Sequence, residues 1–246
     1  LVEIARDKTL YVQEFAKGKA IGKLKNKGPV RRRGTKIKFH PDPEIFGAKS
    51  RFHPDQLYQM ARSKAFLYKG VEIRWQCDPS LISKLENIPQ EEKLHFPGGL
   101  RDYLSSSLNG RRKIIDSSFT GEANLSGSNG RVEWALAWPE EDESILVSYC
   151  NTVITSEGGT HELGLRSALS KGLKAYAELV GNKRSAIITA DDILGNTWGL
   201  ISVFIPNPEF QGQTKNKLTN PGVARNIENS IKDHFDHFLS GDPSAA

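Results

Sequence analysis

Cysteine and long apolar segments are what this sequence has least of. Its 246 residues include two cysteines, Cys77 and Cys150, and no Cys-x-x-Cys spacing, which argues against a disulfide scaffold and a zinc ribbon. No apolar run approaches the roughly 18 to 20 residues that a membrane helix needs. Leu1–Leu10 mixes acidic, basic and isolated apolar residues, unlike a signal peptide. These absences predict a cytoplasmic protein.

Familiar catalytic and metal-binding patterns are missing as well. The sequence contains neither a Walker-type phosphate loop nor a dinucleotide-binding glycine fingerprint. His234 and His237 lie beside acidic neighbours, but such helical pairs without a third ligand are usually solvated surface. Asp191-Asp192 is typical of a structural acidic turn. We therefore predict no metal site. No convergent partner is evident for the remaining histidines, which are His40, His53, His95 and His161.

Basic residues exceed acidic ones, and much of the excess lies in one segment. The formal net charge is +5 and the pI is near 9.1, which favours polyanionic partners. The segment Lys17–Lys38 has no acidic residue and ten basic ones, namely Lys17, Lys19, Lys23, Lys25, Lys27, Arg31, Arg32, Arg33, Lys36 and Lys38. We favour a solvated hairpin here. The alternative is an electrostatic surface for DNA phosphates, bound without sequence preference.

Apolar periodicity predicts an α+β fold. The predicted strands are Leu1–Ile4, Leu10–Phe15, Gly34–Phe39, Val71–Trp75, Lys113–Phe119, Val132–Trp138, Ile145–Asn151 and Gly199–Ile205. The predicted helices are Pro54–Tyr68, Leu100–Leu108, His161–Val180 and one that begins at Pro221 with Asn220 as its N-cap. Polar segments predict loops at Leu81–Glu92, Leu125–Gly130 and Glu140–Glu143. Because Asn109-Gly110 ends a helix, we divide the chain into domains 1–109 and 110–246.

Two loops of the second domain have residues suited to binding a phosphate. In Phe210–Leu218, Gln213 offers amide donors and Lys215 a compact charge, although composition alone favours an ordinary solvated loop. In Glu157–Glu162, a glycine pair permits a sharp turn and Thr160 is placed to cap the next helix. An anion at this helix start is the alternative, and we favour the capped turn.

Several of these segments, taken in order, resemble one family. Ser148–Thr152, Glu157–His161 and Gly164–Leu169 are similar to three consecutive features of the ATPase subunits of bacterial type IIA DNA topoisomerases, namely an asparagine, a Gly-Gly-Thr-His sequence after a spacer of variable length, and the helix that follows. Phe210–Leu218 resembles the Gln-Thr-Lys loop of that family. The segments Arg33–Asp42 and Ala65–Val71 resemble the end of its Bergerat-type (GHKL) ATPase domain.

The resemblance implies a fold and an activity. Residues 1–109 would be the C-terminal portion of a GHKL ATPase domain, and residues 110–246 a transducer domain with a mixed sheet like that of ribosomal S5 domain 2. The family couples ATP hydrolysis to the passage of one DNA duplex through another, which makes its members isomerases. Implied partners are double-stranded DNA, a second copy of the same chain in an ATP-dependent dimer, and the DNA-cleaving A-type subunit.

The resemblance also implies roles for four residues. Gln213 and Lys215 match the pair that contacts the γ-phosphate, with Lys215 stabilising its charge. Thr35 matches the threonine near the adenine, and Arg6 matches the arginine at the pocket mouth. ATP and Mg²⁺ are the implied cofactors of the complete subunit.

One departure from the family pattern limits what this chain is expected to do alone. The general-base glutamate, the Mg²⁺-binding asparagine, the adenine-reading aspartate and the glycine-rich lid of the family all belong before Leu1. We therefore expect the isolated chain to be inactive and to bind no ATP tightly.

Two alternatives remain open. Within the family, the segments Phe210–Lys215 and Val180–Lys183 favour topoisomerase IV, and gyrase is the first alternative. The other alternative is a non-catalytic basic module for DNA binding or interaction, related to mismatch-repair transducers. The Gln-Thr-Lys loop argues against it, because such a module needs no phosphate sensor.

Overall fold

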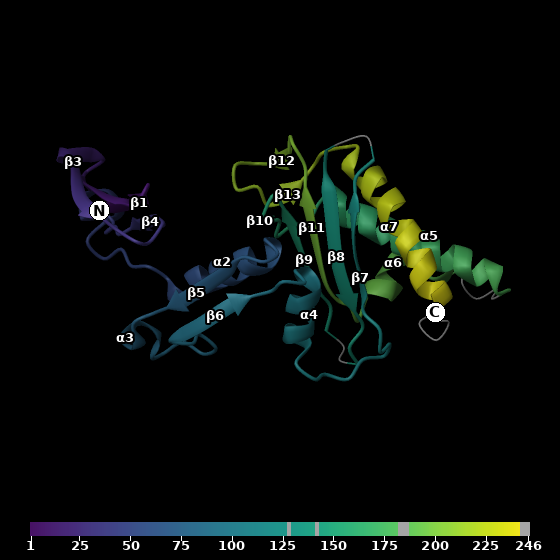
Figure 1. The fold of residues 1–246 in the computed structure, drawn as a ribbon. Coiled ribbons are helices and arrows are strands. Elements are labelled where there is room, and N and C mark those ends of the chain that lie inside the picture. Colours follow the sequence, from purple (N-terminus) through teal and green to yellow (C-terminus); the bar gives the residue numbers. More distant parts are fainter. Residues whose placement is uncertain (127–128, 141–142, 182–186, 242–246) are drawn as a thin grey trace. The chain divides into compact units, whose positions relative to one another are not determined.

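The chain forms two compact units. The structure, a computed structural model, describes residues 1–126, 129–140, 143–181 and 187–241 (Figure 1). The units are Leu1–His53 and Pro54–Ala246. Residues 54–109 therefore pack with the second unit, and the division into domains 1–109 and 110–246 stays a prediction. The predicted loops at 125–130 and 140–143 and the stretch 180–183 each include residues outside the described ranges.

The first unit is a four-stranded antiparallel sheet with the strand order β3-β2-β1-β4. Two-residue turns at Asp7-Lys8 and Lys17-Gly18 join its first three strands, and their positive φ angles are those of type I′ hairpins. A short helix, α1, follows the sheet. The elements are β1 Val2–Arg6, β2 Thr9–Ala16, β3 Lys19–Pro29, β4 Gly34–Ile37 and α1 Pro43–Phe46. The three predicted strands of this segment are confirmed, with slightly different ends.

The basic segment forms a hairpin with its neighbour. Strand β3 pairs with β2, and nearly all of its side chains are exposed. The predicted solvated hairpin is therefore confirmed. Its exposure leaves the charges accessible to a partner.

The second unit is built on a mixed five-stranded sheet with the order β10-β9-β11-β8-β7. The neighbours β9 and β11 are parallel, and the other pairs are antiparallel. The strands are β7 Phe119–Asn124, β8 Arg131–Ala137, β9 Ile145–Cys150, β10 Val153–Ile154 and β11 Trp198–Phe204. The long helices α5 (Thr160–Leu179) and α7 (Val223–Gly241) lie side by side, while α4 (Leu100–Leu108) contacts β8 and β11 (Figure 1).

Both faces of this sheet are buried. Val132, Trp134 and Leu136 of β8 pack with the residues of α5 and α7, whereas the intervening Ala135 and Ala137 pack with α4. Alternate residues of a strand point to opposite faces, so the helices form two layers around the sheet. Burial on both faces explains why β8 and β11 read as nearly continuous apolar runs. The α+β fold is confirmed.

A two-stranded sheet with its own helix also belongs to the second unit. The helix α2 (Pro54–Leu67) packs against the antiparallel strands β5 (Glu72–Gln76) and β6 (Glu91–His95), which the short helix α3 (Pro79–Ile82) connects. The prediction of a loop over Leu81–Glu92 is therefore wrong in part. Only Leu94 of β6 is buried, and its charged neighbours conceal the strand pattern.

Two further predictions are wrong for local reasons. The strand predicted at Lys113–Phe119 begins instead at Phe119, and Lys113 forms an isolated bridge to Pro139. The observed strand has a weak sequence signal because it includes Gly121, where a Cβ would lie 2.4 Å from the Trp134 ring. Asn220 does not cap the last helix, which begins at Val223. Its side chain accepts a hydrogen bond from the Glu209 amide and donates one to the Asn207 carbonyl. The other predicted helices and strands are confirmed within two residues.

The two cysteines and the apolar character of the helices can also be compared with the sequence. Cys77 and Cys150 are both free thiols, and burial raises the pKa of Cys150 to about 12. Among the helices of the described segments, none has the length and apolar character to span a membrane.

A buried polar network lies where the chain leaves β9 and turns toward α5. Ser148, Thr155 and His161 are at most 2% exposed. The Thr155 hydroxyl lies 3.0 Å from Nε2 of His161 and 2.6 Å from the Ser148 hydroxyl. The Ser148 hydroxyl also donates to the Thr155 carbonyl at 3.1 Å. The prediction that His161 has no convergent partner is therefore wrong.

The His161 ring is neutral in this environment. Burial lowers its pKa from 6.5 to about 4, because the protonated ring would lose its hydration. Nδ1 has no hydrogen-bond partner within the described ranges. A proton on that nitrogen would be a buried donor without an acceptor, which is costly. The folded state therefore disfavours the imidazolium form.

We expect the free energy of unfolding to fall as the pH drops from about 6.5 to about 4. In this window the unfolded chain binds a proton at His161 that the folded chain does not, so acid favours unfolding, by up to roughly 3 kcal/mol. Denaturant titrations across this window should show a smaller loss for His161→Gln than for the original chain. Equal losses in the two proteins would show that His161 does not contribute this dependence.

Candidate functional site

The predicted phosphate-binding loop is the tip of a small hairpin. Strands β12 (Phe210–Gln211) and β13 (Lys217–Leu218) pair antiparallel, and Phe210 lies opposite Leu218. Leu218 is fully buried and anchors the hairpin in the core. Gly212 begins the turn with a φ of 75°, in the left-handed region that favours glycine. The loop thus projects from a fixed base.

Gln213 and Lys215 lie at the exposed tip of this hairpin. In the described parts of the chain neither side chain has a hydrogen bond or an ion pair, and the Lys215 ammonium lies 5.9 Å from the centroid of the Phe210 ring. Lys215 has a φ of 59°, a conformation that costs a residue other than glycine roughly 1 to 2 kcal/mol. Side chains that contribute so little to packing, in a strained turn, are candidates for binding.

The base of the hairpin is joined by backbone hydrogen bonds to the turn before α5. The Glu157 amide donates to the Asn216 carbonyl at 2.9 Å, and the Leu218 amide donates to the Gly158 carbonyl at 3.0 Å. Gly159 lies so close to β13 that a Cβ would come within 2.3 Å of the Leu218 oxygen. The second glycine of the pair noted in the sequence, Gly159, is thus required by the close contact of two backbones.

Thr160 does not cap α5, contrary to the prediction. Gly159 is the N-cap residue and no side chain accepts from the first turn. The Thr160 hydroxyl is buried and has no partner in the described part of the molecule. A Cβ on Gly158 would lie 2.6 Å from the Glu162 carboxylate. A carboxylate therefore lies beside this helix start, which disfavours the alternative of an anion site.

Arg6 and Thr35 lie together in the first unit. Thr35 on β4 is directly opposite Ile4 on β1, and Arg6 follows Ile4 by two residues. The three side chains therefore share one face of the sheet. Thr35 is exposed, and Arg6 is exposed and forms a 3.6 Å ion pair with Asp7.

Part of the charge of the basic segment is neutralised within the unit. Lys17 pairs with Glu44 and Lys25 with Glu14, while Arg32 and Lys36 both pair with Glu3. The remaining basic residues make no ion pair with the described residues, and they are Lys19, Lys23, Lys27, Arg31, Arg33 and Lys38. An excess of exposed positive charge therefore remains.

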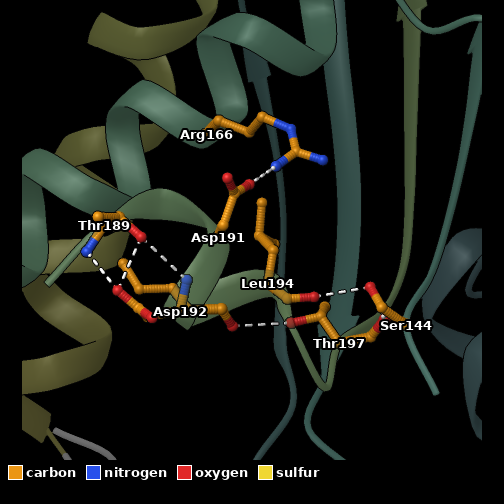
Figure 2. Close-up of polar contacts among 8 residues, drawn as sticks. Ser144, Arg166, Thr189, Asp191, Asp192, Leu194 and Thr197 are labelled. Atoms are coloured by element: carbon orange, nitrogen blue, oxygen red, sulfur yellow. Dashed lines mark hydrogen bonds and ion pairs between the residues drawn. The ribbon is translucent and has the colours of Figure 1, made fainter. Parts of the chain in front are cut away.

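The acidic pair Asp191-Asp192 has a structural role. Asp191 forms a 2.8 Å ion pair with Arg166 of α5 (Figure 2). Asp192 and Thr189 form a capping box at the start of the short helix α6 (Ala190–Leu194), and the Thr189 hydrogen bonds lower the pKa of Asp192. The ion pair joins α6 to α5, and the capping box stabilises the start of α6 itself.

The histidines of α7 also have structural contacts. The His234 ring packs edge-on against Trp134 with 5.1 Å between centroids, and Nδ1 of His237 contacts the Asp233 carbonyl one turn earlier. Within the described ranges, no group of three His, Cys, Asp or Glu side chains is placed to hold a metal ion.

Comparisons with known proteins connect these features to one family. A family model described as DNA gyrase B matches residues 99–246. The chain is 48% identical to the B subunit of DNA topoisomerase 4 from Bartonella bacilliformis, over 100% of this chain and 35% of that protein. It thus spans about a third of the length of such curated relatives.

Solved structures agree with the sequence match. The 43K ATPase domain of Thermus thermophilus gyrase B, in complex with an aminocoumarin, has a TM-score of 0.79 at 26% identity, covering 99% of this chain and 64% of that one. The topoisomerase IV ATP binding domain of Francisella tularensis, in complex with a small molecule inhibitor, has a TM-score of 0.73 at 28% identity, with the same coverage. Because the family model covers more than half of the chain, this protein belongs to the DNA gyrase B family, the B subunits of type II DNA topoisomerases.

Proposed function

We propose that this chain belongs to a cytoplasmic B subunit that couples ATP hydrolysis to DNA strand passage, of the topoisomerase IV branch. The family match and the names of the relatives support the assignment. The observation that carries it is the exposed hairpin tip, where the side chains of Gln213 and Lys215 make no hydrogen bond or ion pair in the described part of the chain and rest on a fixed base. Gyrase is the alternative within the family.

The chemistry of the tip suits a terminal phosphate. An ammonium group such as that of Lys215 stabilises the negative charge that develops on the phosphoryl oxygens, and the Gln213 amide offers further hydrogen bonds. ATP when bound supplies the phosphoryl group that is transferred. The described residues offer no cluster of ligands for Mg²⁺, so the roles proposed for this chain do not include a metal ligand.

The remaining roles are proposals of the same kind. Thr35 has a hydroxyl that suits the polar edge of an adenine, and Arg6 lies two positions farther along the same sheet face, as a residue at the pocket mouth would. A second copy of the same chain and an A-type subunit are proposed as partners. Double-stranded DNA is a proposed partner through the unpaired basic residues of Lys17–Lys38.

Lys215→Ala in the complete subunit should lower ATP turnover by roughly 10² to 10³-fold, as expected for the loss of one donor to a transition-state charge. The melting temperature should hardly change, because the side chain is exposed and alanine accepts the same backbone conformation at a similar cost. Lys217→Ala is the matched control, since Lys217 is also exposed but lies in β13 rather than at the tip.

ATPase rates and thermal melts of both variants test the assignment. If Lys215→Ala keeps normal turnover, or if Lys217→Ala is the damaging change, the phosphate-contact role is wrong. The non-catalytic module then becomes the better account of the chain.

Duplex DNA should bind weakly and without sequence preference, with an affinity that falls steeply between about 50 and about 200 mM salt. The double variant Lys19→Gln with Lys23→Gln should reduce the magnitude of the slope of log K against log salt by up to about 2. Each lost phosphate contact reduces that magnitude by about 0.9. Fluorescence anisotropy measures the slope.

A charge-matched control separates this surface from net charge. Lys84→Gln combined with Lys174→Gln removes the same charge elsewhere and should leave the slope nearly unchanged. An affinity that does not respond to salt, or an equal effect of the two double variants, would contradict a DNA surface on the β3 hairpin.

A further inference from the structure

We infer that Thr155 and His161 are positioning residues for the Gln213/Lys215 loop, because their buried hydrogen bonds fix the turn on which the loop is mounted. The inference rests on the proposed function for what the loop touches. No hydrogen bond among the described residues joins either residue directly to the loop. They act through the backbone of Gly158 and Leu218.

Thr155 is the centre of the arrangement. Its amide donates to the Ser148 carbonyl at 2.9 Å, and its carbonyl accepts from the Gly158 amide at 2.9 Å. Its hydroxyl contacts both Ser148 and His161. One residue thus connects strand β9, the glycine turn and the first turn of α5.

In the network of Ser148, Thr155 and His161, one assignment of donors and acceptors gives every polar hydrogen an acceptor. With the His161 proton on Nε2, the ring donates to the Thr155 hydroxyl, which donates to the Ser148 hydroxyl, which donates to the Thr155 carbonyl. The opposite tautomer leaves the Nδ1 proton without an acceptor among the described residues. A network with every proton satisfied holds a single geometry more firmly than isolated hydrogen bonds do.

Two backbone hydrogen bonds and one close backbone contact connect this network to the loop. The Gly158 amide bonds to the Thr155 carbonyl, and the Gly158 carbonyl accepts from the Leu218 amide, three residues after Lys215. Gly159 leaves no room for even a methyl group against the Leu218 backbone. A displacement of Thr155 therefore moves β13, and with it the turn that carries Lys215.

A purely structural role for the network is the competing explanation, and a matched variant separates the two. Thr155→Val removes the hydroxyl with almost no change in volume. Thr197→Val removes another fully buried threonine hydroxyl, which donates to the Ile193 carbonyl at 3.0 Å in the segment between α6 and β11. No hydrogen bond described for Thr197 leads to the loop, and its surroundings are drawn in Figure 2.

In the complete subunit, Thr155→Val should reduce kcat for ATP about ten- to hundredfold, as a misplaced catalytic group does. The KM for ATP should change much less, because the loop meets only the terminal phosphate. Thr155→Ser, which keeps the hydroxyl, should restore most of the rate. Thr197→Val should lower the melting temperature to a similar extent but keep its kcat.

Combining Thr155→Val with Lys215→Ala tests whether Thr155 acts through Lys215. The double variant should be no slower than Lys215→Ala alone, because a loop without its lysine has nothing left to misplace. Losses that multiply would overturn the inference. So would a folded Thr155→Val protein with the kcat of Thr197→Val.

These outcomes are distinguishable from a failure of the proposed function. If Lys215→Ala itself keeps normal turnover, the proposed function fails, whatever Thr155→Val does. If Lys215→Ala is slow and Thr155→Val is not, only the positioning role fails. Ser148→Ala is the milder variant in case Thr155→Val does not fold. It keeps the bond between Thr155 and His161, and it should give a smaller loss of kcat with the KM unchanged. An unaltered kcat in Ser148→Ala would then overturn the inference.

Discussion

The hydrogen bonds of the Thr155 hydroxyl are the constraint on which the candidate site depends. They lie at the end of β9, where the chain must leave the sheet, turn and begin the 20-residue helix α5. Because β9 and β11 are parallel, the connection between them crosses from one end of the sheet to the other, and α5 is the main part of that crossover. A fixed start for α5 therefore also fixes the helix layer above the sheet.

The turn that begins α5 also supports the hairpin of Gln213 and Lys215. These two roles together explain the residues found in the turn. A helix start is commonly capped by a side chain. Here β13 lies against the turn, so that Gly159 takes the N-cap position and the cap is given up. The fold places Glu162 in the first turn instead, where a carboxylate is favourable at the positive end of the helix dipole. Local helix stability is thus lower than it would be with a cap, and close contact with β13 is gained.

Most of the architecture followed from the pattern of apolar residues, since burial on both faces of the large sheet and on one stripe of each long helix leaves a strong periodic signal. The edge strand β6 lacked that signal because only Leu94 is buried. Strand β7 was misplaced because it includes Gly121, a residue that weakens the strand pattern, and the reason for that glycine is the Trp134 ring on the neighbouring strand, which leaves no room for a Cβ. Gln213 and Lys215 were identified by their residue types and the family resemblance. The network of Ser148, Thr155 and His161 was missed because no sequence motif links its members, and only the folded turn brings their side chains together. A serine within the apolar run of β9 was the one available hint.

Amide hydrogen exchange measures the connection between this network and the loop most directly. The Leu218 amide, which donates to the Gly158 carbonyl, reports whether the base of the hairpin opens. In the 246-residue chain, Thr155→Val should accelerate exchange at Leu218 by about tenfold or more, while the amides of β8 and β11 exchange as before. Such a change corresponds to roughly 1.4 kcal/mol in local opening. Unchanged protection of Leu218 in a folded Thr155→Val protein would contradict the account.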